Sequence, residues 1–181
     1  MKISLAPALR WERYNPAVRT FICTAALFIF AVCSSASNST QNVDRVIVLK
    51  KERTLQLMSH GKVLKTYKVA LGGNPVGPKL QQGDHRTPEG TYVLDHRNVH
   101  SHYYKSIHIS YPSAIDRAKA AKLHVSPGGD IFLHGLPNGY GAVGSAHRLR
   151  DWTDGCVAVT DEEIDEIWKL VPDGTPIEMR P

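Results

Sequence analysis

Cysteine is scarce in this chain, and its scarcity excludes several kinds of site. Three cysteines occur among 181 residues, and two of them, Cys23 and Cys33, lie close to the N-terminus. The third, Cys156, has no partner for a disulfide in the rest of the chain and cannot build a multi-cysteine metal site. A lone thiol of this kind is either buried and inert or retained for its reactivity, and its neighbours must distinguish the two.

A strong excess of charge of one sign is also missing once the N-terminus is set aside. The chain has 22 basic and 17 acidic residues. Residues 1–36 hold four of the basic and one of the acidic residues, so the remainder carries a net charge of +2. A nearly balanced domain lacks the electrostatic footprint of a phosphate-backbone binder, and we therefore expect no nucleic-acid partner.

The chain has no apolar run as long as the roughly 20 residues that a membrane-spanning helix needs. The apolar segment at residues 21–33 follows a basic stretch that ends at Arg19, and the small residues SSAS come after it. This order is typical of a secretory signal, with cleavage after Ala36. We predict a signal peptide over residues 1–36, with an uncleaved inner-membrane anchor as the alternative, a linker over 37–42 and one domain over 43–181.

The domain is predicted to be mixed and mainly β, with two short helices. Ser113 with Asp116, and Thr160 with Glu163, have the spacing of helix N-terminal capping boxes. The second helix is expected over residues 160–171, with one apolar stripe at helical spacing. His60-Gly61 is typical of a hairpin turn. Alternating apolar residues predict strands near residues 46–49, 55–57, 67–71, 91–94, 107–111, 131–134 and 177–179.

Two short motifs at the ends of a long Gly-rich loop, residues 135–153, carry the chemistry. One is His134-Gly135, at the end of a predicted strand, and the other is Thr153-Asp154-Gly155-Cys156, before the last helix. A thiol needs a base near neutral pH, and histidine is the usual one. Gly155 allows a tight bend and could present an amide N–H to an oxyanion. The pattern indicates a Cys–His acyl-transfer site.

These motifs resemble the signature of the L,D-transpeptidase family, whose catalytic domain is of the YkuD type. The resemblance includes His134-Gly135, the 17 residues that follow, and TDGCVAV. It extends to the segments RTPEGTY, SYPSAIDRAKA, PGGDIFLHGLPNG and VTDEEIDEIWKLVPDGTPIEM, and so covers most of residues 43–181.

The resemblance implies a β-sandwich-like L,D-transpeptidase domain in the bacterial periplasm that acts on peptidoglycan stem peptides. Cys156 would attack the bond between meso-diaminopimelate and D-Ala, and His134 would accept and return the proton. The Gly135 carbonyl would orient the imidazole, and the N–H groups of Gly155 and Cys156 would bind the oxyanion. The resulting thioester would pass to an amine, giving a cross-link or attachment to an outer-membrane lipoprotein. Carbapenem-type inhibitors are expected to bind.

The sequence departs from the common family pattern at two positions near the thiol. Asp154 stands where many members have His, and Ala158 stands where many have Arg or Asn. Both changes resemble those of a proteobacterial branch of the family with the motif DGC-x-A. An acid beside Cys156 disfavours the thiolate. We therefore expect Asp154 to point away and pair with a base such as Arg148 or His147. Together with Thr153, it is a candidate substrate-binding residue.

Other activities remain open. The same thiol could serve a hydrolase, either an L,D-carboxypeptidase or an amidase that releases a wall-attached protein, or the domain could be a non-catalytic wall-binding module. His96, His100 and His102 have a spacing that suggests zinc, but no carboxylate completes the set. We interpret this stretch as exposed, polar and loop-like, and expect neither a metal nor an organic cofactor.

Overall fold

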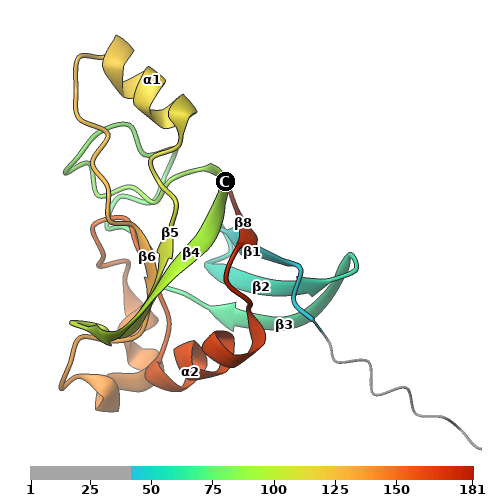
Figure 1. Cartoon of the computed structure of the whole chain (residues 1–181). Coiled ribbons are helices and arrows are strands. Elements are labelled where there is room, and N and C mark those ends of the chain that lie inside the picture. The colour runs from blue at the N-terminus through green and yellow to red at the C-terminus, as the bar shows by residue number, and fades with distance from the viewer. Residues whose placement is uncertain (1–41) are drawn as a thin grey trace, which may run out of the picture. The chain divides into compact units, whose positions relative to one another are not determined.

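The computed structural model describes residues 42–181 (Figure 1). The predicted signal peptide or anchor, and all of the predicted linker but its last residue, lie outside the described residues. Within residues 42–181, no helix is both long enough and apolar enough to cross a membrane.

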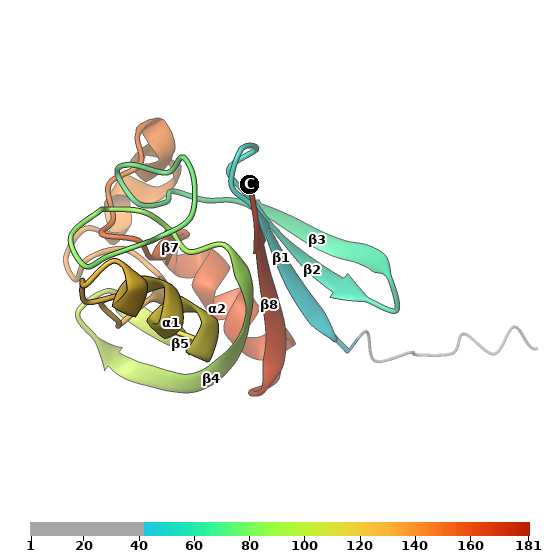
Figure 2. The same cartoon turned by 90° about the horizontal axis from the view of Figure 1, so that it is seen from above.

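One eight-stranded sheet forms the framework, with the strand order β3-β2-β1-β8-β4-β5-β6-β7. The pairs β1–β8 and β6–β7 are parallel, and the other neighbours are antiparallel. The long β4 is curved (Figure 2). The strands are β1 (Arg45–Leu49), β2 (Thr54–Ser59), β3 (Lys62–Lys68), β4 (Gly90–Ser101), β5 (Tyr104–Ile109), β6 (Phe132–His134), β7 (Val157–Ala158) and β8 (Thr175–Arg180).

Both predicted helices are present, and their caps are those that the sequence predicts. Helix α1 (Ala114–Lys122) begins after Ser113 and helix α2 (Asp161–Leu170) after Thr160, each with a complete capping box. These reciprocal hydrogen bonds satisfy N–H groups that the first helical turn leaves unpaired. The two helices lie at opposite ends of the sheet in Figure 1.

The turn between β2 and β3 is the predicted hairpin. His60 and Gly61 have φ values of 49° and 76°. Positive φ at both central positions matches the turn twist to that of the flanking strands, and glycine adopts it without steric cost.

The core lies between α2 and the sheet. Ile164 and Ile167 of α2 are completely buried, and Trp168 packs against the same cluster. This confirms that the apolar stripe is a packing surface. Because only two residues separate α2 from β7, its burial also anchors the strand that follows Cys156.

Two loop predictions were wrong. Most of the stretch from His96 to His102 is strand and not loop, because β4 continues to Ser101 and pairs with β5. Cross-strand pairing there outweighs the polar composition of the segment. The loop over residues 135–153 contains a 3₁₀ segment, η2 (Gly141–Leu149), which is kinked at Gly144.

The burial of α2 yields a stability prediction. Ile167→Ala should lower the free energy of unfolding by about 2–5 kcal/mol, because a fully buried side chain leaves a cavity. Urea denaturation followed by circular dichroism measures this. Ile115→Ala in α1 is the matched control, since Ile115 is 67% exposed, and should change stability by less than about 0.5 kcal/mol. Equal effects of the two substitutions would contradict the assignment of the core.

Candidate active site

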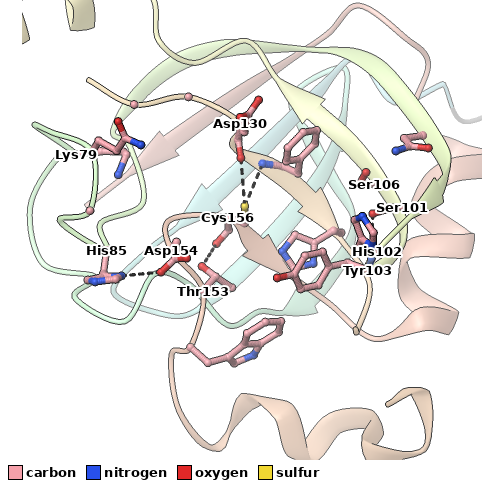
Figure 3. A pocket seen from close by; sticks show the side chains of 18 residues that line it. Lys79, His85, Ser101, His102, Tyr103, Ser106, Asp130, Thr153, Asp154 and Cys156 are labelled. Carbon is pink, nitrogen blue, oxygen red and sulfur yellow. Dashed lines mark hydrogen bonds and ion pairs between the residues drawn. The ribbon is translucent and has the colours of Figure 1, made fainter. Parts of the chain in front are cut away.

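The candidate site forms where β6 and β7 lie side by side. The strands are parallel, and His134 is opposite Ala158 in the register. Cys156 immediately precedes β7, so the register places it next to Phe132 and diagonally across from His134. Cys156 and His134 line the same cavity, of about 610 Å³ (Figure 3). The structure thus brings together two residues that are distant in the sequence.

The turn before Cys156 is held by a buried hydroxyl group. Thr153 Oγ1 donates to the Cys156 carbonyl at 2.9 Å and accepts the Gly155 N–H at 3.1 Å. Gly155 has φ +132°, and a Cβ there would lie 2.6 Å from the carbonyl oxygen of Arg86. The position therefore requires glycine. Thr153 shapes this turn with both of its hydrogen bonds, while also lining the cavity.

One of the two expected oxyanion donors is already hydrogen-bonded in the structure. The sequence predicts that the Gly155 N–H faces a reacting oxygen, but in the structure Thr153 accepts this N–H. The Cys156 N–H has no hydrogen-bond acceptor among residues 42–181. It is therefore the free donor next to the sulfur.

The thiol of Cys156 is half-buried and contacts backbone groups of the strand next to it. Its Sγ accepts the Phe132 N–H at 3.4 Å and donates to the Asp130 carbonyl at 3.7 Å. Burial raises the pKa of Cys156 to about 11, and the negative charge of Asp154 acts in the same direction, whereas the Phe132 N–H opposes both. The resting thiol is therefore protonated at neutral pH.

The imidazole of His134 is buried and oriented by the adjacent residue. Its Nδ1 donates to the Gly135 carbonyl at 2.7 Å, which leaves Nε2 to accept a proton. Its ring centroid lies 4.5 Å from that of Tyr103 and 5.9 Å from that of Trp152. Burial lowers the pKa of His134 to about 4, although the Gly135 carbonyl acts in the opposite direction. The resting imidazole is therefore neutral.

Gly135 is closely surrounded by side chains. A Cβ there would lie 2.6 Å from Asp161 Oδ1 and 3.2 Å from the side chains of Ile164 and Tyr104. The bond from His134 to its carbonyl agrees with the orienting role that the family resemblance implies.

The two candidate reactive groups share a cavity without a hydrogen bond between them. The sulfur's partners among residues 42–181 are the backbone groups of Phe132 and Asp130, and none of its bonds reaches His134. With both groups neutral, proton transfer must accompany attack on a bound substrate. Such contacts commonly tighten once a substrate is bound.

Asp154 is paired with a base, but not with either base that the sequence suggested. Its Oδ1 lies 2.7 Å from Nδ1 of His85. Arg148 instead pairs with Glu163, and His147 accepts a weak hydrogen bond from Trp152. The expectation of Arg148 or His147 as its partner was therefore wrong, because both have other partners.

Sequence reasoning missed three residues that complete the cavity. Tyr103 and Trp152 contact the His134 ring, and Phe132 supplies an N–H to the sulfur. Trp152 immediately precedes the TDGC motif, so its position was a usable signal. Tyr103 lies in the β4–β5 turn, which no local pattern connects with the thiol.

The histidines at positions 96, 100 and 102 do not assemble with other ligands. Within the part of the chain that the structure describes, no group of three or more His, Cys, Asp or Glu side chains is arranged to hold a metal ion. His102 alone of the three lines the thiol cavity.

Comparison with known proteins shows the family. Residues 43–179 match the model of the YkuD L,D-transpeptidase catalytic domain. The chain therefore belongs to the L,D-transpeptidase catalytic-domain family. It is 34% identical to YafK of Escherichia coli (strain K12) over 131 residues, which is 68% of this chain and 45% of YafK.

Solved structures agree with this assignment. The helical cell shape determining protein Pgp2 of Campylobacter jejuni is 26% identical, with a TM-score of 0.60 over 77% of this chain and 48% of Pgp2. An L,D-transpeptidase of Xylanimonas cellulosilytica, 15% identical over 77% of this chain and 61% of its own, has a TM-score of 0.51 and shares the fold. The mainly β fold with short helices is thus confirmed. The chain spans less than half the length of YafK and Pgp2.

The state of the thiol can be tested by alkylation. Because burial raises the pKa of Cys156 to about 11, its reaction with iodoacetamide should keep accelerating above pH 10. Peptide mapping after quenched alkylation isolates Cys156 from the other cysteines. The urea-denatured protein is the control and should show an inflection near the ordinary value of about 8.5. A plateau below pH 8 in the folded protein would contradict the burial argument.

Proposed function

We propose that this protein is an exported cysteine acyltransferase that remodels peptidoglycan in the periplasm. The observation that carries the proposal is the shared cavity of Cys156 and His134, in which the Gly135 carbonyl holds the imidazole with Nε2 free. Membership of the L,D-transpeptidase family supports a cell-wall substrate. The relative Pgp2 is a helical cell shape determining protein, and a role in cell shape fits the same class of substrate.

The first half-reaction forms a thioester. Sγ of Cys156 attacks the carbonyl carbon between meso-diaminopimelate and D-Ala while its proton moves to Nε2 of His134. The oxygen becomes an oxyanion, to which the free Cys156 N–H donates. The C–N bond then breaks, Nε2 gives its proton to the departing amine, and D-Ala leaves.

The second half-reaction transfers the acyl group. An amine attacks the thioester and loses a proton to Nε2 of His134, and the tetrahedral intermediate then expels the sulfur, which takes the proton back. The acceptor is a second stem peptide or an amine of an outer-membrane lipoprotein. If water attacks instead, the product is a shortened stem peptide.

Both reactive groups are neutral before the substrate binds. The low pKa of His134 and the high pKa of Cys156 both arise from burial, which disfavours charge before the substrate is bound. Charge then develops during attack, where the Cys156 N–H and the Gly135 carbonyl are already in place.

Intact-mass measurement tests the proposal directly. Incubation with disaccharide tetrapeptide should increase the mass of the wild-type protein by that of the substrate less D-Ala, and Cys156→Ala should abolish the adduct. In a separate incubation, a carbapenem should also form a covalent adduct at Cys156. His134→Gln should slow acylation by about 100-fold or more, because it removes the proton acceptor.

The products decide between the two outcomes of the second step. Cross-linked dimers indicate transfer, and tripeptide alone indicates hydrolysis. A folded wild-type protein that forms no adduct with either reagent, or a Cys156→Ala variant that still does, would overturn the proposal and favour a wall-binding module.

The pH dependence of acylation follows from the buried imidazole. His134 must be neutral to accept the proton, and its pKa is lowered to about 4. The acylation rate, measured as D-Ala release in a single turnover, should therefore change little between pH 7 and pH 5. It should fall steeply below pH 4, as the imidazole becomes protonated. An acid limb centred near the ordinary value of about 6.5 would contradict the role of burial.

A further inference from the structure

A hydrogen-bonded pair, His85 and Asp154, lies in the thiol cavity but has no part in the mechanism above. Nδ1 of His85 is 2.7 Å from Oδ1 of Asp154, and both residues line the cavity. In Figure 3 the pair lies on one side of Cys156, and Tyr103 lies on the other. The side chain of Asp154 is 89% exposed. An exposed hydrogen-bonded pair of this kind contributes little to stability, so stability gives no reason for the pair.

The backbone places His85 firmly at the cavity rim. Its carbonyl accepts the Asn74 N–H at 2.9 Å, and a Cβ on Gly72 would lie 2.3 Å from that carbonyl oxygen. The carbonyl oxygen of the next residue, Arg86, would lie 2.6 Å from a Cβ on Gly155. The backbone of His85 is therefore fixed by packing, and from this position its imidazole binds the Asp154 carboxylate.

The charge of Asp154 is not cancelled by a lysine or arginine. Lys79 is the one lysine or arginine among the cavity-lining residues, and its Nζ pairs with Asp84 at 2.7 Å. The second oxygen of Asp154, Oδ2, has no hydrogen-bond partner among residues 42–181. An oriented carboxylate with a free oxygen, two residues before the thiol, is suited to accept hydrogen bonds from a cation.

We infer that Asp154, positioned by His85, is a specificity-determining residue that accepts hydrogen bonds from an ammonium group of the acyl donor. This inference rests on the proposed function, in which the donor residue is a diamino acid. One of its carboxyl groups forms the bond that Cys156 attacks, and its second amino group is free and protonated. The negative charge beside the thiol disfavours thiolate formation, and binding of the donor ammonium neutralises that charge when the substrate is in place.

Two donors that differ by one acetyl group test the inference. The free-amine tetrapeptide and its analogue, N-acetylated on the diamino acid, are compared in single-turnover acylation, so that no acceptor enters the measurement. The wild-type protein should acylate faster with the free-amine donor, by roughly fivefold in kcat/KM. Asp154→Asn should slow the free-amine donor alone and bring the ratio close to one. Because the contact is ionic, added salt should reduce the wild-type ratio.

Matched variants separate recognition from general damage. Asp95→Asn is the control, because Asp95 forms an equivalent pair with His108 at 2.7 Å but does not line the cavity; it should keep the wild-type ratio. His85→Ala should lower the ratio. His85→Asn should restore part of it, because asparagine tolerates the positive φ of 53° at this position and offers an amide donor.

The acetylated donor also reports on folding, since Asp154→Asn should react with it at least as fast as the wild type, because the charge that opposes thiolate formation has been removed. If Asp154→Asn leaves the ratio of the two acylation rates at its wild-type value, the inference is overturned. It is also overturned if Asp130→Asn, instead of Asp154→Asn, brings this ratio to one. Equal acylation of the wild type by both donors would overturn the inference while leaving the proposed function intact. Acylation by neither donor would overturn the proposed function, and the inference with it.

Discussion

The candidate site depends on the backbone register between β6 and β7. Val159 N–H donates to the His134 carbonyl at 3.0 Å, and Ala158 exchanges two hydrogen bonds with Ala70, at 2.9 and 3.0 Å. A slip of one residue would turn Cys156 to the opposite face of the sheet. The full burial of Ala158 in this pairing also accounts for a small side chain at that position. Main-chain pairing, rather than a direct side-chain contact, thus sets the geometry of the thiol and the imidazole.

Burial gives the site its chemical character. The ring of His134 is covered by Tyr103 and Trp152, and the thiol of Cys156 contacts the edge of β6. Both groups are consequently neutral at rest, with the pKa of each displaced in the direction that opposes charge. A protected thiol of this kind avoids oxidation and unselective alkylation, because the thiolate is the reactive form. Cys156 then becomes reactive only when a substrate is bound and the thiol proton moves to His134 during attack.

Local signals in the sequence predicted local structure well. The capping boxes at Ser113 and Thr160 depend on contacts three residues apart, so spacing alone reveals them. The partner of Asp154 could not be predicted in this way. His85 lies 69 residues away, and it reaches the cavity only because the loop after β3 packs back on the TDGC turn. The extent of β4 was missed for a related reason, since its pairing with β5 outweighs a polar composition.

A buried lysine links the loop that carries His85, between β3 and β4, to the end of strand β1. Lys50, which follows β1, donates from Nζ to the carbonyls of Gly77 and Thr87 and to Oε1 of Glu89, at 2.7 to 2.9 Å. These three acceptors match the three donors of an ammonium group, which compensates for its burial. The acceptors lie on both sides of His85 along the loop between β3 and β4, so this one cation holds the loop against the sheet. The cavity rim is therefore continuous with the folded core, and a substrate meets a preformed carboxylate.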